Sequence, residues 1–111
     1  MFGLFKKETQ KTLAYEDTRR VLYVKKNCPF CKAALAALRR IENSYYIPHA
    51  KRIEVKWIDE SDSAIREELS VLSNMGVKQD ASPVLLYEGI VIAGCYTSRQ
   101  YEMLLLKLFF G

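Results

Sequence analysis

Two cysteines that stand two residues apart, at the end of an apolar run, constrain this 111-residue chain more than any other feature. Cys28 and Cys31 follow the apolar residues 21–24 directly and precede a helical pattern at 33–41. A cysteine at a helix start lies among unpaired backbone N–H groups and near the positive end of the helix dipole, which favours the thiolate. Three flanking lysines act in the same direction. We therefore predict that Cys28 is a low-pKa nucleophile and Cys31 its resolving partner.

The composition indicates one ordinary globular domain. Half of the 111 residues are hydrophobic and 27% are charged, which is sufficient for a core without covalent cross-links. Three cysteines are too few for a disulfide framework, so the C-x-x-C pair indicates redox or metal chemistry. No apolar run approaches the ~18 residues of a membrane span, and the apolar start of the chain is too short for a secretory signal. We expect a cytoplasmic protein that has no membrane partner.

The positive charge of the chain is unevenly distributed. Residues 1–56 hold 13 Lys and Arg against 5 Asp and Glu, whereas residues 57–111 hold 4 against 8. No aromatic-basic stretch or recognition helix accompanies the basic half, so we expect a solvated basic face and no nucleic-acid partner. The cationic surroundings of Cys28 suit an anionic thiol substrate.

The hydrophobic pattern of residues 19–111 predicts a βαβ unit followed by a ββα unit. A continuously apolar strand at 20–25, a helix with Pro29 in its first turn and an alternating strand at 52–58 form the first unit. A right-handed crossover makes these two strands parallel. Within the alternating strand we place Trp57 in the core.

A β-hairpin and a final helix form the second unit. The strands 81–87 and 90–93 are separated by the two-residue turn Glu88-Gly89. Capping residues mark the ends of the later helices: 59–62 before the second helix, Gly76 after it, and Ser98 before the last. The element order β-α-β-α-β-β-α predicts an α/β fold with one four-stranded mixed sheet and helices on both faces.

Residues 1–18 form an extension before this domain. Apolar positions scattered among polar ones suggest a short helix from about Glu8 to Asp17. A membrane-surface anchor at residues 2–7 is the alternative, but one short apolar patch binds a membrane weakly. We expect this segment to pack on the domain or to fray.

The element order and three motifs resemble the glutaredoxin family. The motifs are Cys28-Pro29-Phe30-Cys31 after the first strand, Ser82-Pro83-Val84 before the third, and Ala93-Gly94-Cys95 before the last helix. The Cys-Pro-aromatic-Cys form differs from the Cys-Gly-Pro-Cys of thioredoxins and the Cys-Gly-Phe-Ser of monothiol glutaredoxins. The resemblance covers roughly residues 19–110, and it implies a thioredoxin-like fold for residues 19–111.

The resemblance also implies an activity, that of a glutathione-dependent thiol–disulfide oxidoreductase. Cys28 would take glutathione from a mixed disulfide or open a protein disulfide, and Cys31 would then close an intramolecular disulfide. Glutathione would reduce the pair again, as a co-substrate and not as a bound cofactor. The implied partners are glutathione and disulfide-containing or glutathionylated proteins, and we expect a monomer.

Four residues near the cysteines match the family's glutathione-binding positions. Lys25 matches the motif lysine, and Phe30 stands where many members have tyrosine. Pro83 matches a cis-proline that turns the backbone of Ser82 outward, where an extended substrate pairs as an added strand. The alternative for Pro83 is an ordinary trans turn proline at a strand start.

The loop before the last helix completes the implied site but departs from the family pattern. Gly94 and Cys95 match, whereas Tyr96 and Thr97 replace two acidic residues that in the family meet the γ-glutamyl amine. Backbone groups at the helix start still suit the γ-glutamyl carboxylate. The alternative for Cys95 is a half-buried structural thiol.

Four alternatives to this function are considered at this level. Cys28, Cys31, Cys95 and His49 are four potential zinc ligands, but lone and widely separated positions are unlike a zinc site, and we expect no metal. A bridging iron–sulfur cluster is disfavoured by Pro29, by analogy with the family. The replaced acids favour either an electron donor that thioredoxin reductase reduces, or a non-enzymatic redox sensor or adaptor.

Overall fold

The computed structural model of the chain describes residues 9–12, 18–59, 61–74, 77 and 82–111. Three α-helices and five strands are present in these ranges, with one short 3-10 turn. In chain order they are β1 (Thr9–Thr12), β2 (Arg20–Val24), α1 (Pro29–Ser44), η2 (His49–Lys51), β3 (Glu54–Trp57), α2 (Ser63–Asn74), β4 (Val84–Tyr87), β5 (Ile90–Ala93) and α3 (Ser98–Phe110). The order predicted for residues 19–111 is confirmed.

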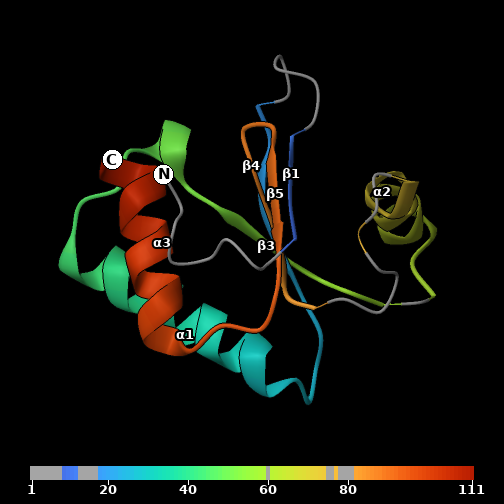
Figure 1. Cartoon of the computed structure of the whole chain (residues 1–111), viewed down its shortest axis with the longest axis horizontal. Coiled ribbons are helices and arrows are strands. Elements are labelled where there is room, and N and C mark those ends of the chain that lie inside the picture. The colour runs from blue at the N-terminus through green and yellow to red at the C-terminus, as the bar shows by residue number, and fades with distance from the viewer. Residues whose placement is uncertain (1–8, 13–17, 60, 75–76, 78–81) are drawn as a thin grey trace.

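The strands form a single mixed sheet in the order β1-β5-β4-β2-β3. Strands β2 and β3 are parallel, as a βαβ crossover requires, and the other pairs are antiparallel. Helices α1 and α3 cover one face and α2 lies on the other (Figure 1). Glu88 and Gly89 both have positive φ, which is typical of a two-residue hairpin turn. The predicted four-stranded mixed sheet with helices on both faces is confirmed, and β1 adds a fifth strand.

This fifth strand corrects the helix that we predicted from Glu8 to Asp17. Residues 9–12 pair antiparallel with β5, with Thr9 opposite Ala93 and Thr12 opposite Ile90. The backbone of β5 offers hydrogen-bonding groups along its outer side, and threonine suits an extended conformation. The other residues of the predicted helix, and the anchor considered at 2–7, lie outside the described residues.

Strand β2 is buried on both faces, as its continuous apolar run predicts. Leu22 and Val24 belong to the core beneath α1 and α3, whereas Val21 and Tyr23 pack on the other face, where α2 lies. Because both faces of β2 are covered, its register and its end point are fixed from both sides. This fixes the position at which the chain leaves the sheet towards Cys28.

The structure contradicts our placement of Trp57 in the core. Its side chain is 48% exposed, although Ile53 near the start of the strand is buried. The reason is the sheet order, since β3 is an edge strand of the sheet that the described residues form. Alternation identified the face on which Trp57 lies but not the position of its strand in the sheet.

The helix caps agree with the sequence in kind but not always in position. Thr97, and not Ser98, is the N-cap of α3, because its Oγ1 accepts from the Gln100 amide at 3.2 Å while the Gln100 side chain accepts from the Thr97 amide at 2.9 Å. Asp62, one of the residues predicted to cap α2, accepts from two first-turn amides through Oδ1. Gly76 lies outside the described residues.

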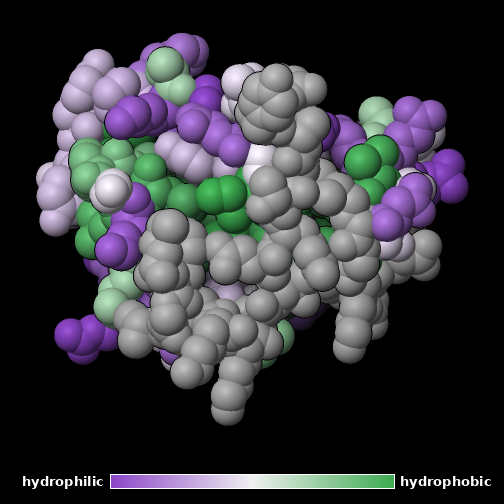
Figure 2. Space-filling model, turned by 45° about the horizontal axis from the view of Figure 1, so that its top comes forward, coloured by the Kyte–Doolittle hydropathy of each residue, from purple (hydrophilic) through white to green (hydrophobic). Residues whose placement is uncertain are grey.

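Exposed aromatic side chains gather where the C-terminal ends of α1 and α3 meet. The rings of Tyr45 and Phe110 lie 5.4 Å apart and both are about half exposed. Figure 2 shows hydrophobic side chains on the side of the molecule where Figure 1 places α3. Within the described residues, no helix is long and apolar enough to cross a membrane.

A partly buried polar contact joins α2 to the sheet. The fully buried Tyr23 donates its hydroxyl to Glu68 Oε1 at 2.6 Å, and Lys56 Nζ lies 3.0 and 3.1 Å from the two oxygens of the same carboxylate. Burial by itself raises the pKa of Glu68, but the hydrogen bonds from Tyr23 and Lys56 outweigh it, and the net pKa is lowered. The carboxylate is therefore stabilised in its ionised form.

We predict that Glu68→Ala lowers the free energy of unfolding by about 1–3 kcal/mol at pH 7, because the carboxylate loses its hydrogen bonds with Tyr23 and Lys56. The pKa of Glu68 in the folded state is lowered, so the ionised carboxylate contributes fully to the free energy of unfolding above its unfolded pKa of about 4.3. This contribution is lost as the pH falls through the folded pKa. Urea denaturation between pH 3 and pH 7 measures both effects. Glu67→Ala, at an exposed neighbour, is the control, and an equal loss in the two variants would contradict the prediction.

Candidate active site

The dithiol begins where β2 ends and α1 starts. Cys28 is the N-cap residue of α1, with extended backbone angles, and Pro29 occupies the first turn, where its missing N–H costs no hydrogen bond. Cys28 Sγ accepts a hydrogen bond from the Cys31 amide at 3.2 Å. Asn27 turns the chain into the helix with a φ of 57°. The sulfur thus accepts the hydrogen bond that a side-chain oxygen accepts in most helix N-caps.

Cys31 lies one helical turn further on, beneath Cys28. Its side chain is only 1% exposed, and its sulfur accepts from the Lys25 amide at 3.4 Å. A substrate therefore reaches Cys28 first and meets Cys31 only after Cys28 has reacted.

The two thiols have opposite pKa shifts. Burial raises the pKa of Cys31 to about 11, with a further contribution from the neighbouring Cys28. Burial also raises the pKa of Cys28, but hydrogen bonds from the Cys31 thiol, the Cys31 amide and Ser82 outweigh it, so the net pKa is lowered. The pair therefore consists of one thiolate-forming sulfur and one proton-bearing sulfur.

The segment before β4 forms one side of the site. The peptide bond between Ser82 and Pro83 is cis, which confirms the predicted isomer and excludes the trans alternative. Cys28 Sγ lies 3.7 Å from Ser82 Oγ and 3.9 Å from the Ser82 carbonyl oxygen. Strands β2 and β4 are antiparallel neighbours with Tyr23 opposite Val84, and this pairing brings Ser82 beside the loop that follows β2.

The loop at 94–97 leads from β5 to α3, and one of its side chains turns inward. Tyr96 is 3% exposed, and its ring packs edge-on against Tyr101 at a centroid distance of 5.3 Å. The Tyr101 hydroxyl donates to the Gly94 carbonyl oxygen at 2.9 Å and so holds the loop to α3. A ligand contact of Tyr96, which stays a prediction, would therefore use its backbone.

The structure contradicts the alternative that Cys95 is half-buried, because its side chain is exposed. It follows β5 directly, on the turn before the buried Tyr96. Its predicted contact with a ligand is sterically open and stays a prediction.

An open hollow of about 650 Å³ lies beside the loop that precedes the dithiol, at the end of β3. The residues that line it come from the loop after β2 and from the end of β3: Lys25, Lys26, Trp57, Ile58 and Asp59. The sequence indicated Lys25 but not the hollow. The hollow can be predicted only when β3 is known to be an edge strand, and a periodic pattern does not show this. Phe30 is 42% exposed in the first turn of α1.

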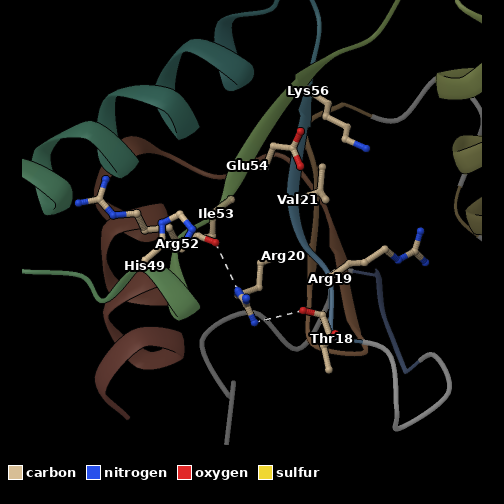
Figure 3. Close-up of a pocket in the computed structure, with 9 residues that line it drawn as sticks. All are labelled: Thr18, Arg19, Arg20, Val21, His49, Arg52, Ile53, Glu54 and Lys56. Carbon is tan, nitrogen blue, oxygen red and sulfur yellow. Dashed lines mark hydrogen bonds between the residues drawn. The ribbon is translucent and has the colours of Figure 1, made fainter.

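A second hollow, of about 470 Å³, lies at the opposite end of the sheet beside the start of β2 (Figure 3). Five of its nine lining residues are basic: Arg19, Arg20, His49, Arg52 and Lys56. Their charged groups do not converge, since Figure 3 shows the Arg19 and Arg52 side chains extending in opposite directions. Arg20 itself donates to the Thr18 and Arg52 carbonyl oxygens and forms an ion pair with Glu88.

The position of this second hollow separates His49 from the cysteines. His49 is exposed near the start of β2, whereas Cys28 and Cys31 follow the end of that strand. Among the described residues, no group of three or more His, Cys, Asp or Glu side chains is placed to hold a metal ion. The four potential zinc ligands thus do not form one site.

A helix-capping cysteine of lowered pKa, a buried partner one turn below it and a mixed sheet with a cis-proline beside the pair define a thiol–disulfide oxidoreductase of the thioredoxin-like fold. The family model described as Glutaredoxin matches residues 21–92 of the 111. The chain therefore belongs to the glutaredoxin family. Comparison with curated proteins found no match, and comparison with solved structures found none either.

We predict that iodoacetamide at pH 7 alkylates Cys28 well before Cys31, because one pKa is lowered and the other is raised to about 11. The alkylation rate of Cys28 falls as the pH drops through its folded pKa, which is lowered from the ordinary value of a cysteine thiol. Mass spectrometry of a Cys95→Ser background between pH 4 and pH 9 gives both rates.

In the same assay, Ser82→Ala moves the inflection for Cys28 to higher pH, because one hydrogen bond to the thiolate is lost. Ser70→Ala, at an exposed position of α2, serves as the matched control. Equal rates for Cys28 and Cys31, or an inflection near that of a free cysteine, would contradict the assigned asymmetry.

Proposed function

We propose that this protein is a dithiol oxidoreductase that uses glutathione to reduce protein disulfides and glutathione mixed disulfides. The proposal depends chiefly on one observation, the hydrogen bond from the Cys31 amide to Cys28 Sγ above a partner thiol that is 1% exposed. That arrangement gives one accessible nucleophile and one protected resolving thiol. Cys28 and Cys31 are the catalytic residues in this proposal.

In the first step, the Cys28 thiolate attacks one sulfur of the substrate disulfide. A new S–S bond forms, the substrate bond breaks, and the departing thiolate takes a proton from solvent. When the substrate is a glutathione mixed disulfide, Cys28 retains the glutathione and the protein thiol is released. A second glutathione thiolate then attacks this intermediate, which restores Cys28 and yields glutathione disulfide.

For a protein disulfide, Cys31 resolves the intermediate. The Cys28 thiolate helps to keep Cys31 protonated, through its negative charge and by accepting a hydrogen bond from the Cys31 thiol. Both effects disappear once Cys28 is part of a disulfide. Cys31 then loses its proton more readily, attacks the Cys28 sulfur and releases the reduced substrate. Two glutathione molecules supply the two electrons that reopen the Cys28–Cys31 bond.

The residues around Cys28 suit an extended anionic thiol such as glutathione. Lys25 supplies a positive charge, and the Ser82 backbone beside the cis Pro83 offers pairing groups for an added strand. Gly94 and Cys95 lead towards the start of α3. In our proposal they contact glutathione on one side of the cysteine pair, and Phe30 contacts it on the other. The capping box uses the Thr97 and Gln100 amides. The amides of Ser98 and Arg99, which lie between them in the first turn of α3, are the donors that we assign to a carboxylate.

A second candidate is an electron donor that thioredoxin reductase, and not glutathione, reduces. The burial of the Tyr96 side chain favours it, because neither acid of the family pattern is present and the side chain that replaces one of them points inward. The rates at which glutathione and thioredoxin reductase reduce the oxidised protein distinguish the two candidates. A protein that neither reductant turns over would be a sensor or adaptor.

We predict that Cys31→Ser keeps activity on a glutathionylated substrate but loses more than about 100-fold in the reduction of a protein disulfide. Cys28 alone can exchange with glutathione, whereas release of a protein disulfide needs the resolving thiol. Cys28→Ser is the matched variant, and it loses both activities. Full reduction of protein disulfides by Cys31→Ser would contradict the assigned role of Cys31.

We predict further that Thr97→Asp lowers the KM for glutathione by up to about 5-fold, because it adds an exposed carboxylate facing the γ-glutamyl amine. Aspartate is also a good N-cap residue, so α3 keeps its start. Thr97→Asn is the matched control, since it caps the helix without adding charge. Steady-state kinetics with glutathione give the comparison, and an equal gain in the asparagine variant would show that charge is not the cause.

A further inference from the structure

The hollow beside the dithiol contains the one tryptophan of the sequence. Trp57 is about half exposed at the end of the edge strand β3, and the Ile58 amide donates to the Val24 carbonyl oxygen at 2.8 Å, which holds this end of β3 to β2. A large apolar ring that is exposed on a rigid strand is typical of a contact surface.

The hollow lies next to the loop that leads from β2 to the reactive pair. Lys25 and Lys26 line it three and two residues before Cys28, and the Lys25 amide donates to Cys31 Sγ at 3.4 Å. The residues on one side of a disulfide presented to Cys28 are therefore within reach of the hollow. The second hollow near His49 lacks this proximity, because it lies at the opposite end of β2.

The charges of the hollow indicate what kind of chain fits. Lys25 and Lys26 oppose the single carboxylate of Asp59, whose Oδ1 already accepts from the amide and the hydroxyl of Ser61 at 2.9 and 2.7 Å. In the part of the chain that the structure describes, neither lysine belongs to an ion pair. Two ammonium groups against one carboxylate, beside an indole ring, suit a segment that carries both carboxylates and an apolar side chain.

We propose that this hollow is the docking site for the protein substrate, and that it selects extended segments with acidic and apolar side chains next to the reactive cysteine. The inference rests on the proposed dithiol chemistry and adds its substrate class. Glutathione brings carboxylates but no apolar side chain, so it leaves the Trp57 ring uncovered. Trp57 and Lys26 are then specificity-determining residues, and Cys28 remains the nucleophile.

The test uses Cys31→Ser combined with Cys95→Ser as the background, so that Cys28 is the remaining thiol and the reaction stops after one exchange. Two peptides of equal length carry one cysteine as a mixed disulfide with a coloured aromatic thiol, one flanked by Glu and Leu and the other by Gln and Ser. The Cys28 thiolate attacks the peptide sulfur, the protein–peptide S–S bond forms, and the aromatic thiolate leaves with the electron pair. Its absorbance gives the rate constant for each peptide.

We expect the background protein to react about 10-fold faster with the acidic-apolar peptide, which is the effect of one aromatic anchor. Trp57→Ala brings the ratio of the two rates close to one, Trp57→Phe keeps most of it, and Lys26→Glu lowers it several-fold. Tyr46→Ala and Lys107→Glu, an exposed aromatic ring and an exposed lysine outside the hollow, keep the full ratio. In the background protein, Trp57 emission moves to shorter wavelength only when the acidic-apolar peptide is captured.

Three outcomes would overturn the docking site: no preference in the background protein, equal slowing of both peptides by Trp57→Ala, or the same loss of preference in the control variants. The assay contains no glutathione. A protein that fails to turn over with glutathione therefore still shows the preference if the hollow docks the substrate. Conversely, glutathione turnover without the preference removes the docking site and leaves the proposed function standing.

Discussion

The hydrogen bond from the Cys31 amide to Cys28 Sγ is the contact on which the rest of the site depends. It exists because α1 starts one residue after Cys28, and α1 starts there because β2, buried on both faces, ends at Val24. A helix start concentrates unpaired N–H groups, and a sulfur at the N-cap receives one of them. Nucleophile activation and helix capping are thus the same interaction, so the fold and the chemistry cannot be separated at this residue.

The same geometry divides the work between two chemically identical side chains. One helical turn places Cys31 beneath Cys28, where burial raises its pKa, while hydrogen bonds lower that of Cys28. Ser82, brought alongside by the pairing of β2 with β4, adds polar groups next to Cys28. The order in which the thiols react therefore follows from depth in the structure and not from residue type.

Local patterns predicted the elements well and their surroundings less well. The apolar run of β2, the helix start at Pro29 and the Glu88-Gly89 turn depend on neighbouring residues and were predicted correctly. The strand β1 was missed, because its extended form depends on pairing with the outer side of β5, some 80 residues later in the chain. Trp57 was misplaced because alternation gives the side-chain face but not whether a strand lies at the edge of the sheet.

The sequence by itself determined the reactive pair, the element order and the resemblance that placed Lys25, Pro83 and the loop at 94–97 around it. These features depend on residue type and spacing, and both can be obtained directly from the amino-acid sequence. Only the tertiary structure decided that Tyr96 turns inward, that Cys95 is exposed and that Trp57 lines a hollow beside the dithiol. Each of these depends on which segments pack together across long stretches of chain, and burial is a property of that packing, not of the residue.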